Sequence, residues 1–486
     1  MSRTRFLHGL RRLAWPLLAA VVLFAVFSQV RNLLVPADAD FDRARWRLTG
    51  DEPAYLLTAQ AIASGDGEDV SRVHAAHTWT NFYARPVIGD RQWTWKDYRG
   101  LGCPFWIDRS EAWGKSRQVI QRPPLIAAFA APFALRPRGA RRAVLCAHAL
   151  FAVLVAFLFC ACAVRSGASG PWAAWTVVCF FGSLPIVYYT AEIFPEVLVG
   201  GMDALALLLC RSRRPAVRSA AAALLIVSLW GTGRVVPAVA VVSLLLAWRE
   251  LRARNIAAVA AYVAGWIVYL AYNLNLWGYP VPPTPPNGGT LTFGALRLGL
   301  LADFFGNDVG LFFLCPVAVV GAWSLAILLL KHRDDPSAWP CLLYSCALAA
   351  VVASFSNPRA GTCPAGRYQV AQAFALAVPP LVLLARAPSA SACGRRLRGL
   401  LVALGGSSLA MGILVGVQPS WWFQRYHPLF KAKRLNPHYA VLPDFQGRWI
   451  VPLLLWTLFF AALTLPWERL FRRIRAKRED DGTKGG

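Results

Sequence analysis

The sequence predicts an all-α, polytopic membrane protein with about twelve transmembrane helices. Of its 486 residues, 57% are hydrophobic and only 16% are charged, whereas about a quarter of a typical soluble domain is charged. The apolar residues form runs of roughly 18 to 25, the length of a bilayer-spanning helix. Basic residues concentrate in the short segments between these runs, as expected of cytoplasmic loops.

The formal net charge of +26 follows from this arrangement and does not indicate a nucleic-acid partner. Positive-inside bias places Lys and Arg beside the cytoplasmic ends of spans, so the expected partners include membrane lipids. The basic groups that follow this bias are Arg3, Arg5, Arg11 and Arg12, then Arg211, Arg213, Arg214 and Arg218, then Arg395, Arg396 and Arg398, and the tail from Arg469 to Arg478.

The first apolar run, Ala14–Val30, is expected to be a retained span with a cytoplasmic N-terminus. A signal peptide cleaved after Ala37-Asp38-Ala39 is the alternative. The run is long for a signal peptide, however, and Arg31 and Asn32 separate it from the candidate cleavage site. A retained span leaves a long first exported loop at about 35–122.

The later spans are expected to alternate in direction, which makes residues 1–486 one transmembrane domain with both termini cytoplasmic. A late exported loop is expected at about 418–448 and a basic cytoplasmic tail at 467–486. The short runs 219–231 and 235–248 leave open a single span or a re-entrant pair. The predicted spans are 143–164, 172–190, 197–210, 219–231, 235–248, 255–275, 309–330, 339–356, 367–385, 399–417 and 449–466.

This count places the basic loops 211–218, 249–254, 331–335 and 386–398 on the cytoplasmic side. The group Arg136, Arg138, Arg141 and Arg142 departs from the bias, because the same count leaves it exported.

Two segments of the first exported loop are expected to lie at the membrane surface. Pro53 suits the first turn of a helix and Gly65 its end, and Ala54, Leu57, Ala61 and Ile62 would share one apolar face. The run from Pro123 to Leu135 is too short to span and contains three prolines, which indicates an interfacial or re-entrant piece.

Most of the 11 cysteines lie inside apolar runs, where cysteine acts as a small packing residue. No spacing indicates a zinc site. Cys103 and Cys363 are expected in exported loops, and whether they form a disulfide stays open.

The stretch Thr49–Leu57 contains two adjacent carboxylates, Asp51 and Glu52, just beyond the first span. A carboxylate at the hydrocarbon boundary is costly without a partner or a role. Either one could act as the general base that deprotonates an acceptor hydroxyl, and Asp51 is the first choice. Helix capping is the alternative for one of them.

A second acidic site follows at Tyr188–Glu196, where Glu192 and Glu196 are four residues apart. They would share a helical face if the helix continues through Pro195. A solvated helix end is the alternative. Asp203, about two turns further on, is expected to be buried.

Three arginines at the exported ends of apolar runs are candidate ligands of a lipid phosphate: Arg234, Arg359 and Arg367. Arginine suits phosphate because its planar fork donates two hydrogen bonds. Ordinary headgroup contact is the alternative for Arg359 and Arg367. No Gly-rich nucleotide-binding motif is present in the sequence, which favours a lipid-phosphate sugar donor.

These motifs resemble those of the GT-C superfamily of membrane glycosyltransferases, in the bacterial branch related to protein O-mannosyltransferases and lipid A aminoarabinose transferases. Gly50–Leu57 is similar to that family's first-loop motif, whose acidic residue is the catalytic base. Ala191–Glu196 occupies the place of its second acidic site, and Gly366-Arg367-Tyr368 is similar to its Arg-Tyr element. Asn307–Leu311, with Pro316 following, is similar to its turn before a late span.

The resemblance implies inverting transfer of a sugar from a polyprenyl-phosphate donor to a glycan, lipid or protein acceptor. The active site would face the periplasm or the exterior, in the cell inner membrane of a bacterial envelope. Some members bind a divalent metal through acids of both sites; here Pro195-Glu196 stands where many have Asp, so metal use stays open. No other cofactor is implied.

Three other classes of protein remain, one of them a purely structural membrane protein. A transporter or lipid flippase would also place charged residues within the membrane, although such proteins usually show repeat symmetry, and no repeat is evident here. A ligase-type oligosaccharide transferase would carry its large exported loop late in the chain.

Overall fold

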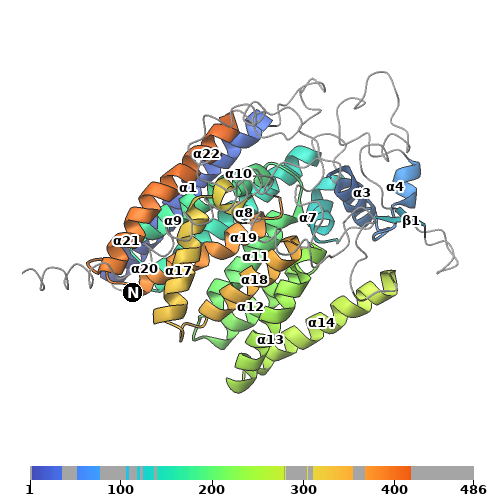
Figure 1. The fold of residues 1–486 in the computed structure, drawn as a ribbon. Helices are drawn as coiled ribbons and strands as arrows, with labels where there is room; N and C mark the ends of the chain where they lie inside the picture. Colours follow the sequence, from blue (N-terminus) through green and yellow to red (C-terminus); the bar gives the residue numbers. More distant parts are fainter. Residues whose placement is uncertain are drawn as a thin grey trace, which may run out of the picture.

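The computed structural model describes residues 3–34, 52–76, 106–108, 118–120, 124–135, 140–277, 280, 304, 310–353 and 367–417. This part of the chain is helical except for two strands of three residues each, so the all-α prediction is confirmed for it (Figure 1). The strands β1 (Trp106–Asp108) and β2 (Gln118–Ile120) form an antiparallel pair in the first loop.

The helices of the N-terminal half are α1 (Arg3–Leu34), α3 (Glu52–Ala63), α4 (Ser71–Ala75), α7 (Leu125–Ala134), α8 (Ala140–Arg165), α9 (Gly170–Phe181), α10 (Leu184–Thr190) and α11 (Pro195–Leu209). Those that follow are α12 (Pro215–Ser228), the 3₁₀ turn η2 (Gly233–Val235), α13 (Val236–Arg252), α14 (Ile256–Trp277), α16 (Leu311–Leu314), α17 (Val317–Lys331), α18 (Ala338–Ala353), α19 (Val370–Leu376), α20 (Val378–Arg386), α21 (Ala392–Leu400), the π-helical turn η3 (Leu401–Gly405) and α22 (Gly406–Val417).

Three helical segments in the described ranges are long and apolar enough to cross a membrane: Arg141–Arg165, Ile256–Leu276 and Ala392–Leu414. A fourth is added if α9 and α10, bent by 68° at their junction, count as one broken span. Six shorter apolar helices accompany them, among them Val317–Lys331 and Ala338–Ala353. A membrane protein is therefore consistent with the helices, and the number of spans is taken up under the proposed function.

Several predicted spans are divided in the structure. The run 172–190 breaks between Phe181 and Leu184, and 309–330 breaks at Cys315. In both cases a proline follows (Pro185, Pro316), and proline favours a new helix start because it lacks the N–H that an interior position donates. The runs 219–231 and 235–248 correspond to two separate helices, α12 and α13, joined through η2.

The predicted basic loop 386–398 is wrong in its second half. Helix α21 begins at Ala392, because the Ser391 side chain accepts a hydrogen bond from the Gly394 N–H at 3.0 Å. A serine in this position supplies the partner that the first turn of a helix lacks. The predicted span 449–466, the late loop 418–448 and the tail 467–486 lie outside the described residues.

Helix α3 forms where Pro53 and Gly65 predict it, but it does not lie half-exposed on a surface. Its residues from Tyr55 to Ala59 are all buried, and the helix packs against α7. It ends in a left-handed glycine, Gly65, with φ +83°, whose N–H bonds the carbonyl of Ile62 while Asp66 bonds that of Ala61. This is the Schellman arrangement. Helices α3 and α7 pack on each other, and α7 keeps an exposed side that includes Leu135, so the interfacial position of the two helices stays a prediction.

Polar contacts gather the ends of several helices into one basic network, which we call the Glu250–Asp335 end. Arg218 of α12 donates to both oxygens of Glu250 of α13 at 2.8 and 2.7 Å. Arg211 and Arg386 bind the buried Asp335 before α18 at 3.1 and 3.0 Å. The predicted cytoplasmic loops 211–218, 249–254 and 331–335 therefore meet at one end of the helices.

Ionisation of Asp335 is favoured at this end. Burial alone would raise the pKa of its carboxyl group, but the neighbouring Arg211 and hydrogen bonds from Ser337 bring the pKa below its ordinary value. Arginines of these loops therefore form ion pairs with buried acids. This is a structural role in addition to the positive-inside bias that the sequence indicates.

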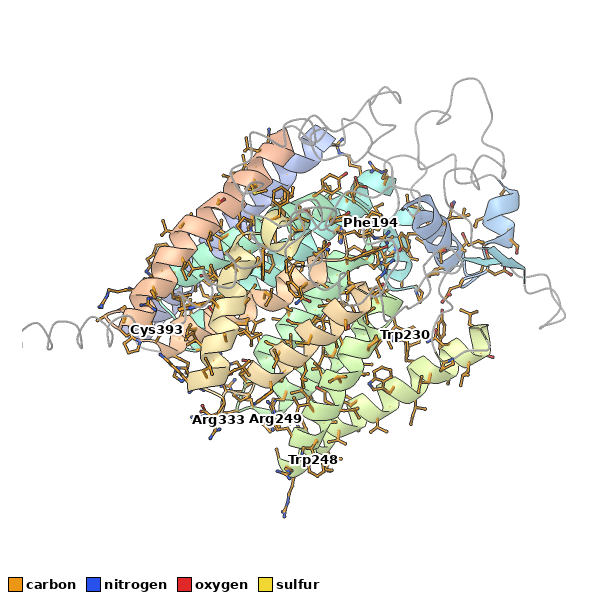
Figure 2. All side chains as sticks on the ribbon, in the orientation of Figure 1. Phe194, Trp230, Trp248, Arg249, Arg333 and Cys393 are labelled. Atoms are coloured by element: carbon orange, nitrogen blue, oxygen red, sulfur yellow. The ribbon has the colours of Figure 1, made fainter. Side chains whose placement is uncertain are left out.

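Figure 2 places Cys393, Arg333, Arg249 and Trp248 along this end of the molecule and Phe194 and Trp230 on the side of α3 and α7. The helices that connect the two ends are α11, α12, α13, α14 and the α19–α20 pair. The helices α11, α13 and the α19–α20 pair each have one terminus in the Glu250–Asp335 end and the other beside the cluster described next, whereas α14 ends near Glu68 and Trp230.

Candidate functional site

The break between α10 and α11 creates the candidate site. Phe194 is extended (φ −133°, ψ 145°) and Pro195 opens α11, so Glu196 falls in the first turn of that helix. Proline suits this position because its fixed φ is already helical. The helix dipole favours a negative side chain there. Glu196 is only 4% exposed, so its charge needs a partner.

Two arginines supply that partner. The Nε of Arg367 donates to Glu196 Oε1 at 2.7 Å, and Nη1 of Arg234 lies 3.5 Å from the same oxygen. Their exposure differs: the Arg234 side chain is 25% exposed and that of Arg367 7%. Arg234 therefore lies toward the outside of the site and Arg367 beneath it. The other oxygen, Glu196 Oε2, is buried with no hydrogen-bond partner among the described residues.

Aromatic rings hold both guanidinium groups. The Arg234 guanidinium carbon lies 3.7 Å from the centre of the Tyr368 ring, and Arg234 Nη2 donates to the Tyr368 hydroxyl at 2.9 Å. The guanidinium of Arg367 lies 4.0 Å from the centre of the Phe194 ring. Such cation–π contacts are strengthened where water is excluded. We call Phe194, Glu196, Arg234, Arg367 and Tyr368 the Glu196 cluster.

The packing of α11 on α19 fixes the register of the cluster. Glu196 contacts Arg367, and one turn further along both helices a Cβ on Gly200 would lie 2.8 Å from Ala371 Cα and 2.8 Å from Phe374. The two helices therefore run side by side in the same direction. Glycine is required for so close an approach, as is common between membrane helices.

The first loop packs on the same end. Tyr55, three residues after Glu52 on α3, meets the Phe194 ring edge-on at 6.4 Å. Leu125 at the start of α7 donates its N–H to the Trp230 carbonyl at 2.9 Å. Glu68 accepts a hydrogen bond from Tyr272 near the end of α14. Helix α3, which begins at Glu52, is thus a neighbour of the Glu196 cluster.

The other predicted acid, Glu192, is buried in the segment between α10 and α11 and accepts a hydrogen bond from Tyr188 at 3.4 Å. His148 of α8 is also fully buried, with its ring edge-on to Phe129 at 6.3 Å and toward the main chain of Glu192. Neither acid is a solvated helix end. The condition under which Glu192 and Glu196 would share one helical face is not met, because residues 191–194 interrupt the helix and α11 begins at Pro195.

The structure brings together Glu196, Arg234 and Arg367 among the predicted site residues. Asp51, the side chain of Glu52, and Arg359 lie outside the described residues, as do Cys103 and Cys363. The sequence did not indicate that Phe194 and Tyr368 hold the arginines, because no spacing rule links an aromatic residue to a cation on another helix. His148 was also missed.

Asp203, predicted to be buried, is completely so and accepts a hydrogen bond from Tyr344 of α18 at 2.5 Å. This contact links α11 to α18 within the bundle and is separate from the Glu196 cluster. It supplies a partner for one of the two oxygens of a side chain that is costly to bury.

No model of a known protein family, no curated protein and no solved structure matches this chain. Within the described ranges, no group of three or more His, Cys, Asp and Glu side chains is arranged to hold a metal ion. What the arrangement offers chemically is a pair of guanidinium groups next to the first loop, one buried and one partly exposed. Such a pair is suited to binding an anionic oxygen group.

Proposed function

We propose that this protein is a membrane glycosyltransferase of about twelve spans that moves a sugar from a polyprenyl-phosphate donor to an acceptor hydroxyl. The observation that carries the proposal is the convergence of Arg234 and Arg367 on Glu196, beside the helix that begins at Glu52. Buried arginines of this kind favour an anionic ligand that is itself removed from water, as a lipid phosphate would be.

The proposed topology places the Glu196 cluster at the exported face of the cell inner membrane and the Glu250–Asp335 end in the cytoplasm. The arginine-rich loops at one end support this orientation through the positive-inside bias. Helices shorter than an ideal span, such as α12 and α13, would complete the count with local tilt or thinning of the bilayer.

In the proposed reaction, Asp51 or Glu52 accepts the proton of the acceptor hydroxyl as its oxygen attacks the anomeric carbon of the sugar. The bond between that carbon and the phosphate oxygen breaks, and the lipid phosphate departs with the bonding electrons. Arg234, Arg367 and, by extension from the sequence, Arg359 stabilise the charge that develops on the phosphate. No step is assigned to a divalent metal.

The test is transfer of radiolabelled sugar from polyprenyl-phosphate donors in membranes that contain wild type, Asp51→Asn or Glu52→Gln. We expect the variant that lacks the base to lose at least a hundredfold in rate, since general-base catalysis contributes about 10²–10⁴-fold. Full activity in both variants would refute the assignment of the base.

A transporter or lipid flippase is the second candidate, and Asp203 favours it. A carboxylate held by Tyr344 inside the bundle is a feature of proteins that carry ions or polar groups through membranes. Vesicles that contain the purified protein separate the two functions. Movement of a labelled lipid between leaflets without a change in its headgroup would favour the flippase.

A further inference from the structure

Glu196 carries a negative charge into the place where an anionic ligand is proposed to bind. Its Oε1 lies 2.7 Å from Arg367 Nε and 3.5 Å from Arg234 Nη1, so it offsets part of the charge of both guanidinium groups. A phosphate that binds these arginines meets a site one unit less positive than the arginines alone would provide. Because the site is buried, this difference is weakly screened by salt.

Glu196 is not the only group that holds the arginines in place. Arg234 stacks on Tyr368 at 3.7 Å and donates to its hydroxyl, and Arg367 stacks on Phe194 at 4.0 Å. These contacts come from Phe194 before α11 and from Tyr368 before α19, independently of the carboxylate. The energetic cost of burying Glu196 is therefore not explained by positioning alone.

The proposed reaction changes the charge of the ligand. The donor is a phosphodiester, which carries one negative charge. The product left behind is a lipid phosphate monoester, which carries about 1.5 to 2 negative charges near neutral pH, as other phosphate monoesters do. A site formed by two arginines alone would bind the product more tightly than the donor and would be inhibited by it.

We propose that Glu196 adjusts the site to the charge of the ligand: it lowers the affinity for a lipid phosphate monoester, with nearly two negative charges, more than the affinity for a lipid phosphodiester with one. The inference rests on the proposed function, because it takes Arg234 and Arg367 to be the phosphate ligands. In turnover Glu196 repels the second charge as it appears on the leaving phosphate, and so promotes release of the product. The phosphate enters from the side of the site where Arg234, the more exposed of the two arginines, lies.

Binding of two sugar-free amphiphiles to the purified full chain in micelles tests this inference by calorimetry. The probes are decyl phosphate, a monoester, and methyl decyl phosphate, a diester. We expect the ratio of monoester affinity to diester affinity to be lower in wild type than in a variant that lacks the Glu196 charge. In Glu196→Gln, affinity for the monoester should rise by on the order of tenfold relative to the diester, as expected for one unit of charge at close range.

Three further variants serve as a substitute and as controls for Glu196→Gln. Glu196→Ala replaces Glu196→Gln if the latter does not fold, and Glu196→Asp should retain the wild-type ratio because it keeps the charge. Glu68→Gln removes a carboxylate outside the cluster and should also retain the ratio.

Two results would overturn the inference. In the first, the ratio of monoester affinity to diester affinity stays unchanged when the Glu196 charge is removed, although Arg234→Gln weakens the binding of both probes. That result would support the phosphate site and refute the role assigned to Glu196. In the second, Arg234→Gln and Arg367→Gln leave the affinity for both probes unchanged, and the phosphate site of the proposed function fails together with the inference.

Discussion

Glu68 shows how a single carboxyl group ties the first loop to the helices. Burial raises the pKa of its carboxyl group above the ordinary value of 4.5, although the hydrogen bond from Tyr272 acts in the opposite direction. Tyr272 in turn packs edge-on to Trp230, with ring centres 4.6 Å apart. The segment after α3 is therefore attached to the end of α14 at a site where burial favours the protonated acid, although the hydrogen bond itself favours the carboxylate.

The sign of the resulting pH dependence follows from the raised pKa. The folded contact binds the proton more tightly than the unfolded chain does, so its stability is fully present below pH 4.5 and is lost as the pH rises through the folded pKa. We expect the protection of amides 64–72 against hydrogen exchange, corrected for intrinsic rates, to fall from pH 4.5 upward. Glu68→Gln should remove this slope, and a flat wild-type profile would contradict it.

At the scale of elements, the contact between α11 and α19 sets the geometry of the Glu196 cluster. Glu196 lies in the first turn of α11 and Arg367 just before α19, and the two helices approach closely at Gly200. A side chain at position 200 would have to push Ala371 and Phe374 aside, since a Cβ there lies 2.8 Å from both. The packing at Gly200, four residues from Glu196, thus controls the distance between Glu196 and Arg367.

Gly200→Ala is expected to destabilise the protein by roughly 1–3 kcal/mol, the usual cost of overpacking, and to weaken binding of methyl decyl phosphate. Thermal unfolding in micelles and calorimetry measure the two effects. The matched control is Gly399→Ala in α21, where no atom lies within 4 Å of the added Cβ and where alanine is the better helix former. Equal unfolding midpoints for the two variants would show that the close approach is not required.

Much of the fold was predictable because the relevant signals are local. Pro53 and Gly65 predicted the bounds of α3, and apolar runs predicted the positions of α8 and α14 to within a few residues. The break in the run 172–190 and the helical start at Ala392 were not predicted. They depend on the choice of cap and on packing against distant helices, which hydropathy does not report.

The site was predictable only in part. Glu196, Arg234 and Arg367 were identified as charges that interrupt apolar sequence, because isolated charges there are costly. Which acid would pair with which arginine was not evident, since the pairs are separated by 38 and 171 residues. The aromatic supports Phe194 and Tyr368 arise from that same tertiary arrangement.

For the whole molecule, the arrangement of two polar ends is the feature from which the functional account is built. Arg211, Arg218 and Arg386 bind Asp335 and Glu250 at one end, and Arg234 and Arg367 bind Glu196 at the other. The helices between the two ends are apolar on the outside, with exposed large side chains such as Leu244, Val263 and Ile267. Lipid is the solvent in which such a surface is favourable.

The central claim is that these ends face opposite sides of a membrane, with the Glu196 cluster exported. Labelling of single added cysteines with an impermeant maleimide in intact cells tests it most directly, with the unaltered chain as background. Ser64→Cys, in the first loop, is predicted to react in intact cells, whereas Arg213→Cys, beside Arg218, should react only after the membrane is opened. Reaction of Arg213→Cys alone in intact cells, or of both variants from the same side, would contradict the account.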